Sequence, residues 1–223
     1  MSWLVNFWQS TVGKKFIMGV SGLVGFGFAL GHMAGNLLVY AGPGALNAYG
    51  AALKGNALLL WGTRGVLIAA VVAHVLAAIT LQGIKSAARP QAYQKLGNRQ
   101  ARPGSRQMML LGWILLIFLI YHILHLTVGA VGPSPFSHTD VHGNLVAGFS
   151  NPLIAGFYIL AMASLFFHLW HGGQSAFYSL GMIHPKYQRP ISLAAFGASI
   201  LIVLGNLSIP ISVMLGVIKR AGS

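Results

Sequence analysis

Histidines inside apolar segments are the residues of this sequence whose type and spacing are best suited to chemistry. Nine histidines occur in 223 residues, and six of them fall inside long apolar runs. An ionisable group in such a run is costly, and it usually faces a bundle interior, a partner or a cofactor. Histidines on four consecutive runs, with no carboxylate among them, favour a cofactor over packing alone. The six are His32, His74, His122, His125, His168 and His171.

The depth of four of these histidines divides them into two pairs. Depth is counted from the end of each run that lies on the same side of the membrane as the N-terminus. His32 and His122 lie about 24 to 26 Å from that end, at about 1.5 Å of rise per residue. His74 and His168 lie about 16 to 20 Å deep on the same rise. Two pairs at two levels suit two b-type haems, each held between neutral imidazoles of two helices. Filling both axial positions of the iron favours electron transfer over oxygen binding.

Other metal chemistry fits the sequence less well. The chain has no cysteine, so it cannot by itself supply iron–sulfur ligands or the Cys-x-x-Cys-His attachment of haem c. A zinc or copper cluster would need three or four ligands at one depth. The pattern therefore favours paired axial ligands over a metal cluster.

Two further histidines leave the ligand assignment open. His125 and His171 each follow a candidate ligand by three residues, on nearly the same helix face. Spacing alone therefore does not decide between His122 and His125, or between His168 and His171. The member that does not bind iron could hydrogen-bond a haem propionate or line a quinone pocket.

Five apolar segments must position the histidines. They lie at about 16–40, 62–84, 108–131, 152–179 and 191–218. The chain is 56% hydrophobic and 7% charged, whereas a soluble domain has roughly 25% charged residues. Each segment is long enough to cross a hydrocarbon core of about 30 Å as a helix. We expect an all-α integral membrane protein with one domain over 1–223, in which five transmembrane helices form a bundle and the first four hold two haems. The mixed aromatic and polar stretch from Trp3 to Val12 predicts a short interfacial helix.

The distribution of basic residues predicts the orientation in the membrane. Ten of the 14 Lys and Arg residues fall on the side of the N-terminus. Because cytoplasmic loops carry the excess of Lys and Arg, the N-terminus is expected in the cytoplasm and the C-terminus outside. We interpret the net charge of +13 as contact with anionic lipid headgroups and exclude nucleic acid as a partner. His138 and His142, in the outer segment 132–151, are expected to be solvated or packed within that loop. The four basic residues on the outer side are Lys54, Arg64, Lys219 and Arg220.

The sequence around the candidate ligands carries motifs that run through nearly the whole chain: Gly31-His32-Met33-Ala34-Gly35-Asn36, Trp61 to His74, Tyr121-His122, His168-Leu-Trp-His-Gly172, Leu180-Gly181 and His184-Pro185-Lys186-Tyr187. With these motifs the chain resembles the cytochrome b subunit of succinate dehydrogenase and fumarate reductase, in the five-helix, di-haem b558 family of membrane anchors. The resemblance implies a distal haem between His32 and His122 and a proximal haem between His74 and His168. It favours His168 over His171, because the family pattern His-x-x-x-Gly continues to Gly172, and it favours His122 over His125.

The resemblance also implies a function in the bacterial inner membrane. The chain would dock a flavoprotein subunit and an iron–sulfur subunit on its cytoplasmic face and pass electrons between the iron–sulfur subunit and a membrane quinone, usually menaquinone. The basic loop 85–107, with Tyr93 and Arg99, is a candidate docking surface, with a lipid-facing loop as the alternative. The chain alone cannot oxidise succinate, because it offers neither a flavin site nor iron–sulfur ligands.

Candidate quinone-binding residues are Asn36, Tyr40, Trp61 and Arg64, which are expected near the outer ends of the first two spans. The alternative is that they anchor the helix ends at the membrane interface, as Trp, Tyr and Arg often do. Two other functions remain open. One is a haem-free structural anchor, and the other is a di-haem cytochrome b that serves another quinone-linked dehydrogenase, such as a hydrogenase or formate dehydrogenase.

Overall fold

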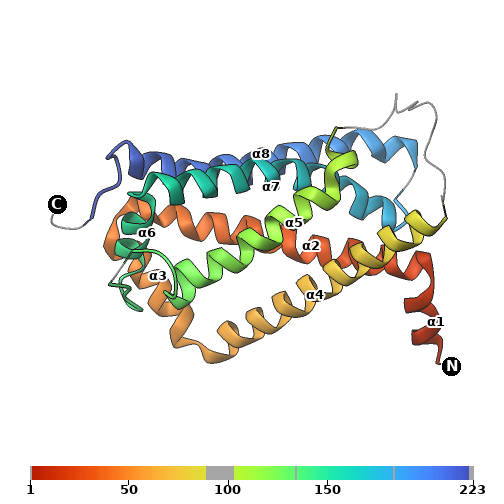
Figure 1. Cartoon of the computed structure of the whole chain (residues 1–223), viewed down its shortest axis with the longest axis horizontal. Helices are drawn as coiled ribbons and strands as arrows, with labels where there is room; N and C mark the ends of the chain where they lie inside the picture. Colours follow the sequence, from red (N-terminus) through yellow and green to blue (C-terminus); the bar gives the residue numbers. More distant parts are fainter. Residues whose placement is uncertain (1, 89–102, 134, 183, 221–223) are drawn as a thin grey trace.

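The computed structural model describes residues 2–88, 103–133, 135–182 and 184–220, without the side chains of 103–106. Its described residues form helices and no strand. Figure 1 shows the long helices lying roughly along one axis. In chain order the elements are α1 Trp3–Gln9, α2 Thr11–Asn36, a 3-10 turn Leu37–Ala41, α3 Pro43–Gly55, α4 Ala57–Ala87, α5 Pro103–Ile123, a π-helical turn Leu124–Val128, α6 Val141–Phe149, α7 Pro152–Ser179 and α8 Pro185–Met214.

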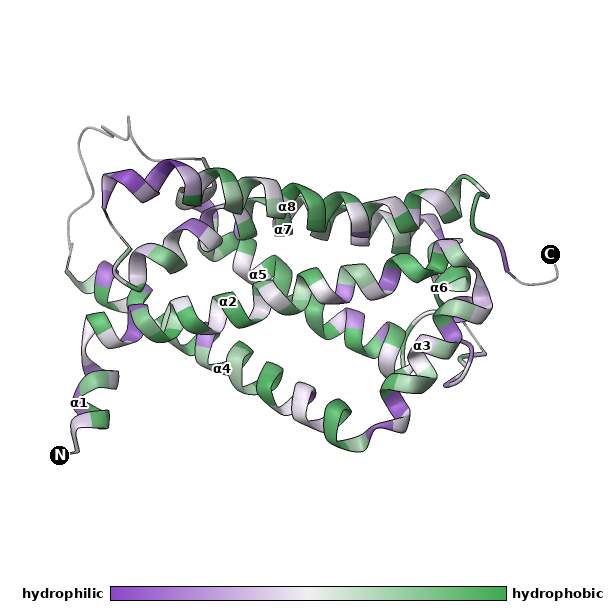
Figure 2. Ribbon diagram, turned by 180° about the vertical axis from the view of Figure 1, so that it is seen from behind, coloured by the Kyte–Doolittle hydropathy of each residue, from purple (hydrophilic) through white to green (hydrophobic). Residues whose placement is uncertain are grey.

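Five of these helices are long and apolar enough to cross a membrane, which confirms the predicted number of spans and indicates a multi-pass membrane protein. Figure 2 shows apolar residues along their middle parts and polar residues gathered toward the two ends. The described ends of the chain lie at opposite ends of the bundle, as an odd number of crossings requires (Figure 1). The spanning segments are Thr11–Ala41, Ala57–Ala87, Met108–Val128, Pro152–Ser179 and Pro185–Met214.

Helices α2, α4 and α8 begin earlier than their predicted apolar segments because polar residues cap them outside those segments, whereas α7 begins at Pro152 as predicted. The side chain of Ser10 accepts a hydrogen bond from Gly13 N–H at 2.9 Å, and that of Asn56 accepts from Leu59 N–H at 2.9 Å. Asn151 caps α7 in the same way, and Pro residues occupy the first turns of α7 and α8. Such residues satisfy or remove the N–H groups that a helix start leaves unpaired. Hydropathy alone cannot place these starts.

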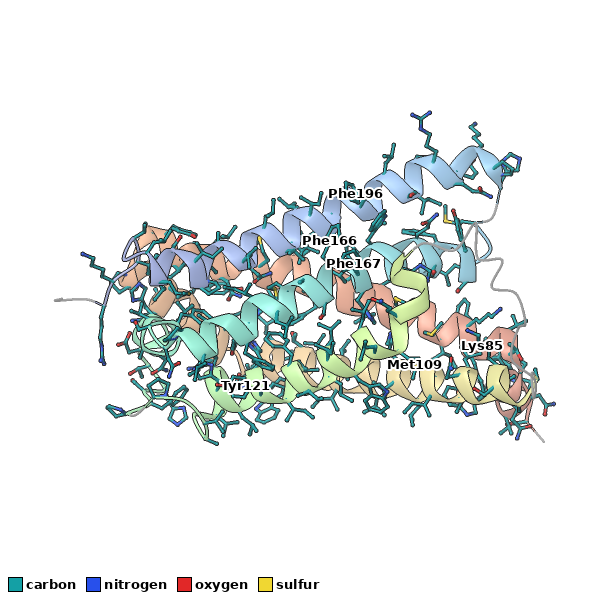
Figure 3. The ribbon with its side chains drawn as sticks, turned by 45° about the horizontal axis from the view of Figure 1, so that its top comes forward. Lys85, Met109, Tyr121, Phe166, Phe167 and Phe196 are labelled. Atoms are coloured by element: carbon teal, nitrogen blue, oxygen red, sulfur yellow. The ribbon has the colours of Figure 1, made fainter. Side chains whose placement is uncertain are left out.

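Helix α7 is the centre of the bundle. It packs against α2, α5 and α8, while α4 packs mainly against α2. Figure 3 shows Phe166 of α7 and Phe196 of α8 turned toward one another, and their ring centroids lie 5.9 Å apart. Helix α4 is peripheral, with Leu58 and Ile68 largely exposed on the surface that lipid would cover. The four helices that carry candidate histidines therefore form two packed couples, α2 with α4 and α5 with α7.

Two short helices, α3 and α6, close the end of the bundle opposite α1, in stretches for which the sequence predicts no helix. They pack on each other and against the ends of α2, α7 and α8. Val39, Leu46 and Phe149 belong to the buried core that forms there. His142 is buried in this layer, so it packs within the outer segment, whereas His138 is exposed.

Asp140, the only acid of the chain, ties the two short helices together. Its carboxylate accepts hydrogen bonds from Asn47 Nδ2 of α3 at 3.0 Å and from Gly143 N–H of α6 at 2.9 Å. These two bonds, in that order, lower the pKa of Asp140, and the charges of His142 and Arg220 add to the effect. A hydrogen-bonded carboxylate of this kind stabilises a helix start most when it is ionised.

We predict that Asp140→Ala lowers the free energy of unfolding by about 1 kcal/mol at neutral pH, because the cap of α6 and the link to α3 are lost. The folded-state pKa of Asp140 lies below its unfolded value, so its contribution is present above the unfolded pKa and disappears as the pH falls through the folded pKa. Thermal unfolding in detergent, measured from pH 7 to pH 3, tests this. Asp140→Asn is the matched control, since it keeps the hydrogen-bonding shape and should lose the pH dependence. A wild type and Asp140→Asn with parallel pH profiles would contradict the assignment.

Candidate functional site

The candidate ligands come together as two pairs inside the bundle. The ring centroids of His32 on α2 and His122 on α5 lie 5.8 Å apart, with the ring planes at 86°. Those of His74 on α4 and His168 on α7 lie 6.1 Å apart, at 58°. These are the pairs that the depth estimate groups together, and each joins two helices that do not follow each other in the chain.

The spacing of both pairs suits a metal ion between two imidazoles. Such rings have their centroids about 6 Å apart, because each metal–nitrogen bond is about 2 Å and the nitrogen lies about 1 Å from the ring centre. Within the described part of the chain, no three His, Cys, Asp or Glu side chains gather closely enough to hold an ion by themselves. Among the described residues the histidines are therefore arranged as two separate pairs of facing imidazoles.

His74 is oriented by the backbone and a hydroxyl group of α2. Its Nδ1 lies 3.1 Å from the carbonyl oxygen of Met18 and 3.2 Å from Ser21 Oγ. A carbonyl oxygen only accepts, so Nδ1 carries the proton and Nε2 keeps its lone pair. Metal-binding histidines typically donate their second ring N–H to a carbonyl oxygen in this way. His74 is thus held in the tautomer that a metal ligand needs.

His168, across from His74, has a buried nitrogen without a partner. Its Nδ1 is inaccessible to solvent and makes no hydrogen bond among the described residues. A buried polar atom in this state is unfavourable and calls for an explanation such as an unseen ligand. His171, the alternative on the same helix, has its Nε2 3.2 Å from Ser175 Oγ one turn further along α7. The geometry therefore favours His168 over His171 as the residue available to a cofactor.

The ring of His125 is held by packing and by a hydrogen bond. It is buried, and its Nδ1 lies 2.9 Å from the hydroxyl of Tyr158. A Cβ added to Gly132 or to Gly148 would lie 2.6 Å from this ring, so the two glycines enclose it closely. His122 instead faces His32. His125 therefore has the surroundings of a packing residue, and His122 those of a candidate ligand.

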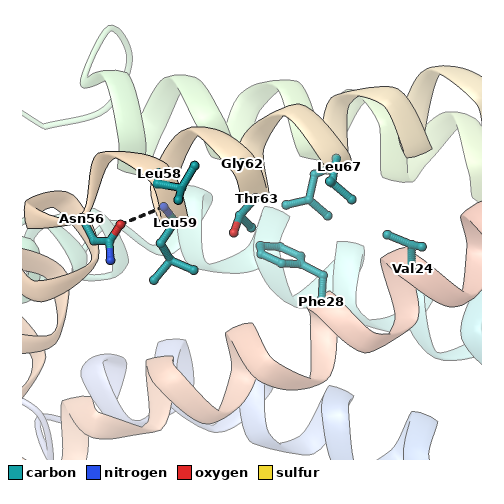
Figure 4. Close-up of a pocket in the computed structure, with 9 residues that line it drawn as sticks. Val24, Phe28, Asn56, Leu58, Leu59, Gly62, Thr63 and Leu67 are labelled. Atoms are coloured by element: carbon teal, nitrogen blue, oxygen red, sulfur yellow. Dashed lines mark hydrogen bonds between the residues drawn. The ribbon is translucent and has the colours of Figure 1, made fainter.

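Open space borders Gly31, which precedes His32 on α2, and Gly172, one turn after His168 on α7. A Cβ on Gly31 or on Gly172 would meet no described atom within 4 Å, whereas one on Gly35 would collide with Tyr49. A cleft of about 690 Å³ opens between α2 and α4, with Phe28 in its wall, and the Phe28 ring stacks on His32 at 5.3 Å. Figure 4 shows Phe28 and Thr63 facing each other across this cleft. Its volume is within the usual range of about 300 to 1,000 Å³ for ligand sites.

The four candidate quinone residues fall into two separate pairs. Asn36 Nδ2 lies 3.5 Å from Asn206 Oδ1, and the Tyr40 hydroxyl lies 2.9 Å from Ser212 Oγ, so both contact α8. On α4 the Arg64 guanidinium lies 4.9 Å from the ring centroid of Trp61. In the described segments no hydrogen bond or ring contact joins one pair to the other. Tyr93 and Arg99 of the candidate docking loop lie outside the described residues.

No protein-family model matches this chain, and no curated protein and no solved structure resembles it strongly enough to count as a match.

Sequence reasoning missed the residues that orient the candidate ligands. Tyr158, Ser21 and the Met18 carbonyl contact histidines that are 36, 53 and 56 positions away in the chain. A polar hydroxyl in an apolar run was the one available signal for Tyr158 and Ser21. No side-chain signal exists for a backbone carbonyl.

We predict that Gly148→Ala destabilises the protein by about 1 to 3 kcal/mol, since the new methyl group would press on the buried His125 ring. Gly156→Ala is the matched control in α7, because a Cβ there meets nothing within 4 Å and alanine favours the helix. Thermal unfolding of both variants in detergent measures the difference. Equal stability of the two variants would show that His125 is not enclosed at Gly148.

Proposed function

We propose that this chain is the di-haem cytochrome b membrane-anchor subunit of a succinate:quinone oxidoreductase in a bacterial inner membrane. The observation that carries the proposal is the spacing of the two histidine pairs, 5.8 and 6.1 Å between centroids, inside a bundle of apolar helices. Without carboxylates in the spans, these imidazoles have no ionic partners within the chain. Cofactor ligation gives a physical reason for placing them there.

His32 with His122, and His74 with His168, are the residues that would hold the two cofactors. A b-type haem bound at each pair would supply a one-electron carrier with both axial positions filled. The Met18 carbonyl keeps His74 in the required tautomer, and Gly31 and Gly172 leave room beside the candidate ligands. Each of these features is one that a bis-histidine haem site needs.

The proposal includes two soluble partners, because the chain has no cysteine for iron–sulfur clusters. A flavoprotein subunit and an iron–sulfur subunit would bind the cytoplasmic face, at the end of the bundle where α4 ends with Lys85 and α8 begins with Lys186. A membrane quinone, menaquinone in particular, would bind near the outer end. Support for this assignment comes from the motifs around the candidate ligands and from the opposite positions of the two chain ends.

We predict that the purified complex contains two b-type haems per chain and that His32→Ala, His74→Ala, His122→Ala and His168→Ala each cause the loss of one. The loss follows because an axial position is left without its imidazole. Reduced-minus-oxidised visible spectra, with haem counted per chain, measure the outcome. His171→Ala is the matched control on α7 and should retain both haems.

Two results would contradict this ligand set. A chain without any haem band would favour the haem-free structural anchor. If His122→Ala or His168→Ala retained both haems, the ligand on that segment would be His125 or His171 instead. Neither result depends on enzymatic activity, so the test separates the cofactor question from the partner question.

We further predict that affinity purification from native membranes recovers a flavoprotein and an iron–sulfur protein together with this chain, and that the complex reduces a quinone with succinate. Recovery of hydrogenase or formate dehydrogenase subunits would instead support the alternative di-haem cytochrome. A matched preparation from cells that lack the chain identifies proteins that bind the resin alone.

A further inference from the structure

Tyr158 is buried between His122, a member of one candidate pair, and the packed His125. Its hydroxyl lies 3.3 Å from Nδ1 of His122 and 2.9 Å from Nδ1 of His125. The ring is packed edge-on against Phe118 and Phe149, with centroids 5.1 and 4.8 Å apart, and only 6% of the residue is exposed. One side chain of α7 therefore contacts two histidines of the α5 segment through a single oxygen atom.

The position of the hydroxyl is fixed from both sides. His125 cannot move away, because Gly132 and Gly148 enclose its ring. It lies in the π-helical turn Leu124–Val128, which directly follows α5 and ends at Gly129 with a positive φ of 76°. Such π-helical turns are frequent at functional sites. His122 and His125 are three residues apart and lie on nearly the same face, so the local backbone brings both to the same hydroxyl.

The Tyr158 hydroxyl and the Nδ1 atoms of His122 and His125 can form a complete chain of hydrogen bonds with one order of donors and acceptors. A tyrosine hydroxyl has one proton to donate and oxygen lone pairs to accept. If His122 uses Nε2 for a ligand, its Nδ1–H donates to the Tyr158 oxygen, and the Tyr158 hydroxyl donates to Nδ1 of His125. Every one of these buried atoms is then satisfied, as buried polar groups require. The opposite order would leave His122 with its proton on Nε2, where no metal could bind.

We propose that Tyr158 is a positioning residue that holds His122 in the ligating tautomer and tunes the cofactor bound between His32 and His122. This inference rests on the proposed function. A metal-ligating histidine becomes more basic when its other ring nitrogen donates a hydrogen bond, and a more basic ligand favours the oxidised metal. The other pair should be independent of Tyr158, because His74 is oriented by Met18 and Ser21.

The test is Tyr158→Phe in the full complex, which removes the hydroxyl and keeps the ring. We expect the midpoint potential of the haem that is lost in His32→Ala to rise by about 59 mV, which corresponds to a tenfold change in a one-electron equilibrium. The potential of the second haem should not change. Tyr121→Phe is the matched control, since Tyr121 contacts the same rings at 5.5 Å from His125 and 6.2 Å from Tyr158 without a hydrogen bond from its hydroxyl among the described residues.

If Tyr158→Phe does not accumulate in the membrane, two variants of His125 test the same inference. His125→Asn retains an acceptor for the Tyr158 hydroxyl, and His125→Leu removes it. The Leu variant should shift the potential of the same haem, and the Asn variant should restore most of the wild-type value. Unchanged potentials in Tyr158→Phe, or equal shifts in Tyr121→Phe, would overturn the role of Tyr158 while two haems remain bound. A wild-type complex without b-type haem would instead overturn the proposed function itself.

Discussion

The constraint on which this structure depends is the need to orient imidazoles inside an apolar bundle without using a carboxylate. The only acid of the chain, Asp140, lies at the end of the bundle opposite α1, where it caps α6 and binds α3. Inside the bundle the partners are therefore neutral: a carbonyl oxygen of α2 for His74, and a tyrosine hydroxyl of α7 for His122 and His125. Neutral partners fix tautomers without adding charge to an apolar interior, where an unpaired ion is costly.

Helix packing follows from the same constraint. The hydrogen-bond partners of His74, His122 and His125 come from a neighbouring helix, so α2 must lie against α4, and α5 against α7. Each candidate pair then spans from one of these helix couples to the other. The helices of a membrane bundle approach one another through small residues, and Gly22 does so here, since a Cβ at that position would lie 3.3 Å from the His74 ring. The close contact of α2 and α4 and the orientation of His74 are thus one structural feature.

The sequence predicted the five spans because hydropathy and length report directly on membrane crossing. It did not predict α3 and α6, because their residues are mixed in polarity and their starts depend on Gly42 and Asp140 in a segment without a long apolar run. Depth along the spans grouped the histidines correctly in space, but it could not separate His122 from His125. That distinction depends on the glycines around His125, which lie 7 and 23 residues further along the chain. Contacts of this kind leave no periodic signal.

The two candidate pairs differ in what orients them, and this difference has a physical consequence. The Met18 carbonyl belongs to the backbone, so no substitution at position 18 removes the acceptor that orients His74. The Tyr158 hydroxyl belongs to a side chain and can be lost by a single change that preserves packing. A carbonyl oxygen also only accepts, whereas a hydroxyl accepts and donates, so the orientation of His122 depends on a second residue, His125. His74 is therefore oriented by the fold of α2, and His122 by a replaceable hydrogen-bond chain. Two histidine pairs of the same composition in one bundle can differ in this way through the residues that orient them.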